Sequence, residues 1–304
     1  MITLKTIRIG ECIQTIVHEN IEDDSLKRLI MSYVDHQLTK GFPFGELLVL
    51  HYQLYHGKET EEIYFIAAAV ELLILAFDIL DDFEDQDTTI KPWNQNSNFA
   101  LNSTTAMQFL CGYIIRKSGF ALKDQAIFLL FQYGLQSINA QHKDLQNICQ
   151  TESDYIEMTI KKSGSLVALS CLIGASLATS HYPKEIEEYA KYIGLIGQIN
   201  NDLADLQNWN DKNDLIYKKY TLPIIYLLNC EDKEIQFVQD YYQNHLPKNE
   251  IIHKRAIIER KLRETGAIQY TEVIKKIYQN RAIDLLKKLN IAPDYFQQLL
   301  KYIL

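Results

Sequence analysis

The chain has 304 residues, 47% of them hydrophobic, so it is long enough to bury a large core. It contains only 12 glycines and 6 prolines, which is few for a β-rich or loop-rich protein. A net charge of −8 and a pI near 5.5 argue against a nucleic acid as the main partner.

The five cysteines are odd in number, widely scattered and without a CxxC pair, which favours reduced thiols over a disulfide framework or a zinc site. The N-terminus lacks the apolar core of a signal peptide. The two most hydrophobic windows, Phe65–Leu80 and Ser165–Thr179, fall short of the roughly 18 apolar residues of a spanning helix. We expect a soluble, cytoplasmic protein, and an association with the membrane surface stays open.

Apolar residues recur at three- and four-residue intervals along most of the chain, and no persuasive alternating strand is found. The sequence therefore predicts an all-α fold of about ten helices around one core, in a single domain spanning residues 1–304. We expect one helix to end at Lys161–Ser165 and a new apolar helix to follow. The expected helices are Ile21–Thr39, Glu46–Tyr55, Glu61 to the first acidic cluster, Ala106–Arg116, Ala121–His142, Tyr155–Lys162, Ser165–Thr179, Glu185–Leu206, Thr221–Leu228, Lys233–Asn244, Ile251–Thr265 and Thr271–Leu289.

The stretch Glu61–Trp93 is a long apolar run that ends in acidic residues. Four of these acids, spaced i, i+3, i+4 and i+7 on one helix face, are Asp78, Asp81, Asp82 and Asp85. They gather near the helix C-terminus, where the helix dipole disfavours negative charge, so they call for a cation. Hard oxygen ligands on a helix suit Mg²⁺. A solvated acidic helix end is the simpler alternative, and an EF-hand calcium loop fits poorly because DDFEDQDTT has no Gly.

A second polar cluster ends a later apolar helix, and its members on one face are Gln198, Asn201, Asp202 and Asp205. Facing each other across a helical bundle, the two clusters would hold roughly two or three Mg²⁺ ions. Such metals need an anion, and a diphosphate suits them. The pairs Lys161–Lys162 and Lys218–Lys219 are candidates to contact its oxygens, although any of these could be a solvated surface lysine.

From about Gly41 to Pro223 the chain resembles the trans-isoprenyl diphosphate synthase family. Asp81-Asp82-Phe83-Glu84-Asp85 looks like the first aspartate-rich motif of that family, and Asn201-Asp202-Leu203-Ala204-Asp205 looks like the second. The remaining matches are Gln198 ahead of the second motif, Gln141 and Asp144 of a GQxxDL-like element, Lys162 of a K-T/S-G-x-L motif and Lys219 of a GKxTLP-like element.

This resemblance implies a central cavity that binds an allylic diphosphate through Mg²⁺. The implied metal ligands are Asp81, Asp82, Asp85, Asn201, Asp202 and Asp205. The implied substrate-binding residues on the donor side are Gln141, Asp144, Lys162, Gln198 and Lys219. Asp82 is either a direct ligand or a carboxylate that holds metal-bound water, and we interpret Asp78 as a solvated acid at the helix end.

The chain departs from the family where the second substrate, isopentenyl diphosphate, is bound. Phe42 and Gly45 stand where the family has a Lys and an Arg, and Ile74 stands where it has a His. Each lost charge-assisted contact is worth about 1.5–3 kcal/mol, so a second diphosphate would bind weakly. After the first motif, Lys91 alone remains as a possible phosphate contact. We therefore expect an acceptor half without other cations, made apolar by Phe42, Phe44 and Ile74, which suits an indole.

Within the family, the stretch up to Pro92-Trp93 looks most like the ComQ-type tryptophan isoprenyltransferases, which modify a competence pheromone precursor in quorum sensing. That resemblance implies transfer of a geranyl or farnesyl group from its diphosphate to C3 of a tryptophan indole in a precursor peptide. Closure of a ring by a backbone nitrogen onto C2 would complete the product. Phe77, one turn before Asp81, is placed to limit the prenyl tail, or is an ordinary core residue. The family also implies a homodimer.

Three alternatives remain. A short-chain prenyl diphosphate synthase would need cations elsewhere, for example in the basic segment around Lys254 and Arg263. A class I terpene cyclase would need Ser or Thr, and then Glu, at positions that are Asp205 and Trp209 here. An inactive subunit that assists a partner synthase would have no reason to keep two acidic clusters.

Overall fold

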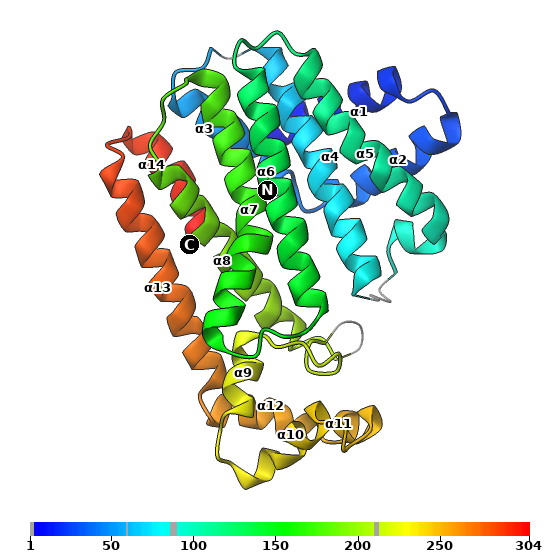
Figure 1. Ribbon diagram of the computed structural model, residues 1–304, viewed down its shortest axis with the longest axis vertical. Coiled ribbons are helices and arrows are strands. Elements are labelled where there is room, and N and C mark those ends of the chain that lie inside the picture. The colour runs from blue at the N-terminus through cyan, green and yellow to red at the C-terminus, as the bar shows by residue number, and fades with distance from the viewer. Residues whose placement is uncertain (1–2, 59, 86–89, 210–212) are drawn as a thin grey trace.

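The computed structural model describes residues 3–58, 60–85, 90–209 and 213–304 (Figure 1). These residues form fourteen α-helices and two 3₁₀ helices, with no strand among them, which confirms the all-α prediction. The helices are α1 (Leu4–Asn20), α2 (Asp24–Leu38), α3 (Pro43–Leu54), α4 (Glu61–Glu84), η1 (Pro92–Gln95), α5 (Ser97–Lys117), α6 (Lys123–Leu145), α7 (Glu152–Ala178), α8 (Glu185–Asp205), α9 (Leu222–Leu228), η2 (Lys233–Ile235), α10 (Gln236–Tyr242), α11 (Lys248–His253), α12 (Arg255–Glu264), α13 (Ala267–Lys288) and α14 (Pro293–Ile303).

The long helices α4 and α7 lie inside the bundle. Helix α4 packs against α1, α3 and α5, while α7 packs against α3, α6 and α8. Both are long and apolar enough to cross a membrane, but most of each helix is buried within the protein. Burial in the bundle core therefore accounts for their apolar composition.

Helix α7 is continuous, so the predicted helix end at Lys161–Ser165 is wrong. Gly164 has another function there. A Cβ atom on Gly164 would lie 2.8 Å from the carbonyl oxygen of Lys191, and one on Gly194 would lie 2.5 Å from Cα of Gly164. These two glycines allow the backbones of α7 and α8 to touch, which brings Lys162 close to the second acidic cluster.

The terminal helices α1 and α14 were not predicted, and the expected helix Ile251–Thr265 is split into α11 and α12. The signal for α1 was nevertheless present in the sequence. Thr3 caps its first turn by accepting a hydrogen bond from the backbone of Thr6, and Ile9, Ile13 and Ile16 lie on its buried face.

Helices α9 to α12 form a smaller group at one end of the bundle, connected back to it by α13 (Figure 1). Apolar side chains of this C-terminal lobe form their own cluster, separate from the main core. A single domain over residues 1–304 stays a prediction.

Candidate active site

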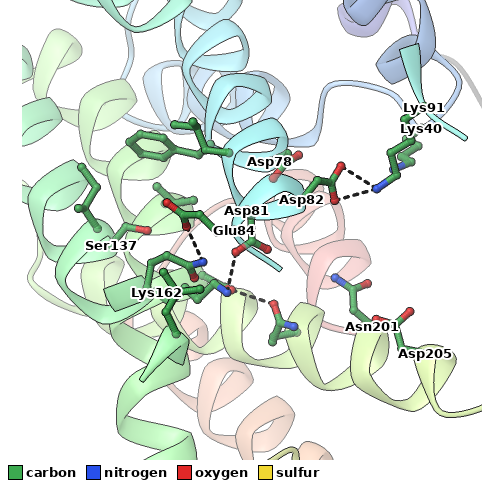
Figure 2. A pocket seen from close by; sticks show the side chains of 18 of the residues that line it. Lys40, Asp78, Asp81, Asp82, Glu84, Lys91, Ser137, Lys162, Asn201 and Asp205 are labelled. Atoms are coloured by element: carbon green, nitrogen blue, oxygen red, sulfur yellow. Dashed lines mark hydrogen bonds and ion pairs between the residues drawn. The ribbon is translucent and has the colours of Figure 1, made fainter. Parts of the chain in front are cut away.

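A pocket of about 820 Å³ lies where the C-terminal ends of α4 and α8 meet. Asp81 and Asp82 of α4 line it together with Asn201 and Asp205 of α8. Figure 2 shows these side chains arranged around one space, with Lys162 of α7 pointing into it. The structure therefore brings the two acidic motifs to one pocket, as the sequence predicted.

Lysines hold the outer acids of the first motif. The Lys162 ammonium donates to Asp81 over 3.0 Å and to Asp144 over 2.8 Å. Lys219 forms an ion pair with Asp85. Burial lowers the pKa of Lys162, but the carboxylates of Asp81 and Asp144 outweigh that effect and raise it above its usual range. Lys162 therefore carries a full positive charge at the centre of the donor site.

Asp82 holds the start of η1. Both of its oxygens accept from Lys91 over 2.7 Å, and the Trp93 indole donates to one of them over 2.8 Å. Trp93 is buried edge-on against Tyr33 and His36 of α2, with ring centroids 5.8 and 5.2 Å away. These contacts favour the interpretation of Asp82 as a supporting carboxylate.

Asn201, Asp202 and Asp205 of the second motif point in different directions. Asn201 and Asp205 line the large pocket, whereas Asp202 is buried, with 3% of its surface exposed. Tyr155 donates to one Asp202 oxygen over 2.5 Å, and Gln198 donates to the other over 2.8 Å. Burial raises the pKa of Asp202 to about 6, against these two hydrogen bonds. Its direct contact with a metal stays a prediction.

Gln141 and Asp144 flank the same site from α6. Gln141 donates from its amide to Glu84 over 2.8 Å, and its buried side-chain oxygen has no hydrogen-bond partner among the described residues. The Thr221 hydroxyl, beside Lys219, is in the same situation. Buried polar atoms of this kind are costly, so both fit a site that receives a polar ligand.

The lining residues fit a divalent cation shared with a substrate. The described residues contain no group of three or more His, Cys, Asp and Glu side chains close enough to hold a metal alone. Carboxylate and amide oxygens instead face one another across the pocket, on α4 and α8. Oxygen ligands from two sides, completed by substrate oxygens, are typical of Mg²⁺ sites.

An apolar wall opposite α2 suits a prenyl tail. Phe77 and Leu80 of α4 line the pocket there, together with Ile138 of α6 and Leu166 of α7. Phe77 therefore lies where the sequence placed it, and its effect on chain length stays a prediction.

The acceptor half differs from the expectation. The structure does not bring Phe42 and Ile74 to the pocket, because both are packed in the core with 2% and 1% of their surfaces exposed. Gly45 has no room for a side chain, since a Cβ atom there would lie 3.0 Å from Ile9 and 3.1 Å from Glu71. Glu71, buried, accepts from the Gly45 backbone over 2.6 Å and fixes the first turn of α3.

Other residues line this half, and sequence reasoning missed most of them. His36 and Lys40, at the end of α2, face the pocket beside Lys91, so the expected absence of other cations is wrong. Asp78 also lines the pocket and is exposed to solvent there, which agrees with its interpretation as a solvated acid at the helix end. No motif marks His36 or Lys40, because only the fold places α2 against the end of α4.

Fold and site together define an all-α enzyme that transfers prenyl groups. Residues 30–259 match the polyprenyl synthetase family, and the chain belongs to that family. It is 36% identical over 98% of its length, and 92% of the relative's, to "Tryptophan prenyltransferase ComQ" of Bacillus subtilis subsp. natto. A protein of the same description from Bacillus spizizenii is 32% identical over 91% of this chain and 98% of its own. A crystal structure of a geranylgeranyl pyrophosphate synthase matches with a TM-score of 0.82 and 19% identity, covering 100% of this chain and 98% of that one.

Proposed function

We propose that the protein is a Mg²⁺-dependent isoprenyltransferase that moves a geranyl or farnesyl group from its diphosphate to a tryptophan of a pheromone precursor peptide. The observation that carries this proposal is the joining of both acidic motifs, Lys162 and an apolar wall in one pocket. The 36% identity to a tryptophan prenyltransferase supports the choice of acceptor. Soluble core packing and five free cysteines support a cytoplasmic location.

The donor half binds and polarises the allylic diphosphate. Asp81, Asp85, Asn201 and Asp205 would hold Mg²⁺, which supplies positive charge to the diphosphate oxygens when bound. Lys162 and Lys219 add two ammonium groups aimed at the same oxygens. As the carbon–oxygen bond breaks, its electron pair leaves with the diphosphate, and the charge that develops there is stabilised.

The indole then reacts from the acceptor half. The π electrons at C3 form the new carbon–carbon bond, a backbone nitrogen closes onto C2, and the proton of that nitrogen passes to the released diphosphate. His36, Lys40 and Lys91 suit the polar backbone of a peptide better than a purely apolar group. Asp78 offers its carboxylate on the same side to the indole N–H.

Elongation with isopentenyl diphosphate is the second candidate, because Lys40 and Lys91 could hold another diphosphate. Lys91 is less suitable than its charge implies, since it already donates to both oxygens of Asp82. An elongated diphosphate formed without any peptide would favour this second function.

A homodimer is part of the proposal. Helices α5 and α6 expose a band of apolar side chains at helical spacing, which are Phe109, Tyr113, Phe128, Phe131 and Leu135. Such a band on a soluble enzyme suits burial against a second copy. Analytical ultracentrifugation tests this: Phe131→Glu should yield a monomer, whereas a monomeric natural protein would contradict it.

The function is tested by incubating the protein with MgCl₂, geranyl or farnesyl diphosphate and a mixture of tryptophan peptides. The expected result is a peptide whose mass rises by one prenyl group. A matched peptide with Phe in place of Trp, and a reaction with EDTA, should both remain unmodified. Modification of the Phe peptide would contradict the proposal, and so would a failure to modify any of the Trp peptides.

A further inference from the structure

The segment between α8 and α9 carries two adjacent lysines whose side chains point opposite ways. Lys219 reaches Asp85 in the donor site. Lys218 reaches the C-terminal lobe, where its ammonium donates to Asn244 over 2.6 Å and lies 4.4 Å from the Tyr241 ring centroid. The left-handed backbone at Lys218, with φ of +55°, produces this divergence.

Side chains from outside the segment hold the backbone of both lysines. Asn147, just after α6, donates from its amide to the carbonyl oxygen of Lys218 over 2.9 Å. The Tyr242 hydroxyl, at the end of α10, donates to the carbonyl oxygen of Lys219 over 2.9 Å. Burial raises the pKa of Tyr242 well above its usual value, so the hydroxyl keeps the proton that it donates.

Several residues around Lys218 have a left-handed backbone conformation. Among the described residues, five that are not glycine have positive φ, and three of those are Asn147, Lys218 and Asn244. Asn147 and Asn244 each hydrogen-bond to Lys218. A left-handed conformation is unfavourable for a lysine and persists only where the surroundings enforce it. The contacts around Lys218 thus determine the direction in which Lys219 leaves the backbone.

We propose that Asn147, Tyr242 and Asn244 are positioning residues that aim Lys219 at the diphosphate of the donor, so that the C-terminal lobe sets the strength of donor binding. This inference rests on the proposed donor site but not on the identity of the acceptor. None of the three residues lines the large pocket or the smaller adjoining pocket in which Lys219 and Asp85 lie. Their effect therefore passes through the Lys218–Lys219 backbone.

The test measures binding of inorganic pyrophosphate, with MgCl₂ present, by calorimetry on the full-length protein. Tyr242→Phe removes one hydroxyl and should weaken binding about fivefold, the usual effect of one lost hydrogen bond. In a Lys219→Ala background the same substitution should have no further effect. A loss of equal size in both backgrounds, or none in the natural background, would overturn the proposal.

The neighbouring Tyr241→Phe is a matched control, because its hydroxyl donates to the carbonyl oxygen of Ile216 in the same segment. Its pyrophosphate affinity should remain unchanged. An equal loss in both tyrosine variants would indicate general loosening and would count against the proposal.

Substitutions of Lys218 provide a second test that leaves the lobe intact. Asn tolerates the left-handed conformation and Val does not, so Lys218→Val should bind pyrophosphate more weakly than Lys218→Asn. Equal affinities would contradict a role for the turn. If the natural protein binds no pyrophosphate at all, the proposed donor site fails first, and the positioning inference fails with it.

Discussion

The donor and acceptor halves of the pocket differ in how their side chains are held. In the donor half, Asp81 pairs with Lys162 of α7, and Asp85 pairs with Lys219 of the segment between α8 and α9. In the acceptor half, His36 and Lys40 come from the end of α2, and Asp82 connects that wall to the acidic motif through Lys91. The residues of the donor half thus belong to motifs that can be recognised in the sequence. The residues of the acceptor half are brought there by the packing of a neighbouring helix.

The largest expected effect is in the donor half. Asp81→Asn removes a charge that faces the second motif and also pairs with Lys162, and it should lower turnover about 10²–10³-fold. Steady-state rates at saturating MgCl₂ measure this. Asp24→Asn, on the exposed start of α2, is the control and should keep full activity. An Asp81→Asn protein with near-normal turnover would break the assignment of the donor half.

Glu71 fixes the first turn of α3, and it makes stability depend on pH. Burial above all raises the pKa of Glu71 from 4.5 to about 8. The folded protein therefore keeps a proton that the unfolded chain has lost, so this group's contribution to stability falls as pH rises from about 4.5 to 8 and then levels off. The shift corresponds to about 3–5 kcal/mol. Denaturant titrations should show a flatter pH dependence for Glu71→Gln, and an unchanged slope would contradict this role.

Two adjacent lysines on α7 provide a sharper comparison within the donor half. Lys162 pairs with Asp81 and Asp144, with 16% of its side chain exposed, whereas Lys161 pairs with Glu157 on the surface, with 41% exposed. Lys162→Ala should raise the KM for the donor about 10- to 100-fold, since one charge-assisted contact is lost. Lys161→Ala should change it less than about twofold. Equal effects at both positions would show that the donor is bound elsewhere.

A substitution of Phe42 tests whether this residue belongs to the core and not to the acceptor half of the pocket. Because Phe42 is a core residue, Phe42→Leu should lower the free energy of unfolding by about 1–2 kcal/mol. The KM for the peptide should not change. A large rise in the KM for the peptide, in a protein of normal stability, would show that Phe42 contacts the peptide after all.

Lys40 is expected to give the smallest effect. Lys40→Ala should raise the KM for the peptide about fivefold through one lost contact and leave the KM for the donor unchanged. Lys27→Ala, on the helix that precedes Lys40, is the control because Lys27 pairs only with exposed Asp24 among the described contacts. A change in the KM for the donor instead would show that Lys40 contacts the donor and not the peptide.

The accuracy of the sequence analysis follows from the same difference. Acids at i, i+3, i+4 and i+7 share a helix face by geometry alone, but the meeting of Asp81 on α4 with Asp205 on α8 was inferred from the need of two acidic clusters for a shared cation. Gly164 was read as a helix end because its true neighbour, Lys191, lies on another helix. Phe42 was assigned to the pocket by its place in a motif, although the crowding at Gly45 turns that motif into core. Packing between distant segments decided each of these cases.

The central claim is that the activated prenyl group passes to an indole and not to a second isoprenoid. A single reaction that contains farnesyl diphosphate, a tryptophan peptide that the protein modifies, and equimolar isopentenyl diphosphate tests it most directly. Mass spectrometry of the products should find the farnesyl group of the donor almost entirely on the peptide. Farnesyl groups found instead in an elongated diphosphate, with the peptide unmodified, would contradict the account.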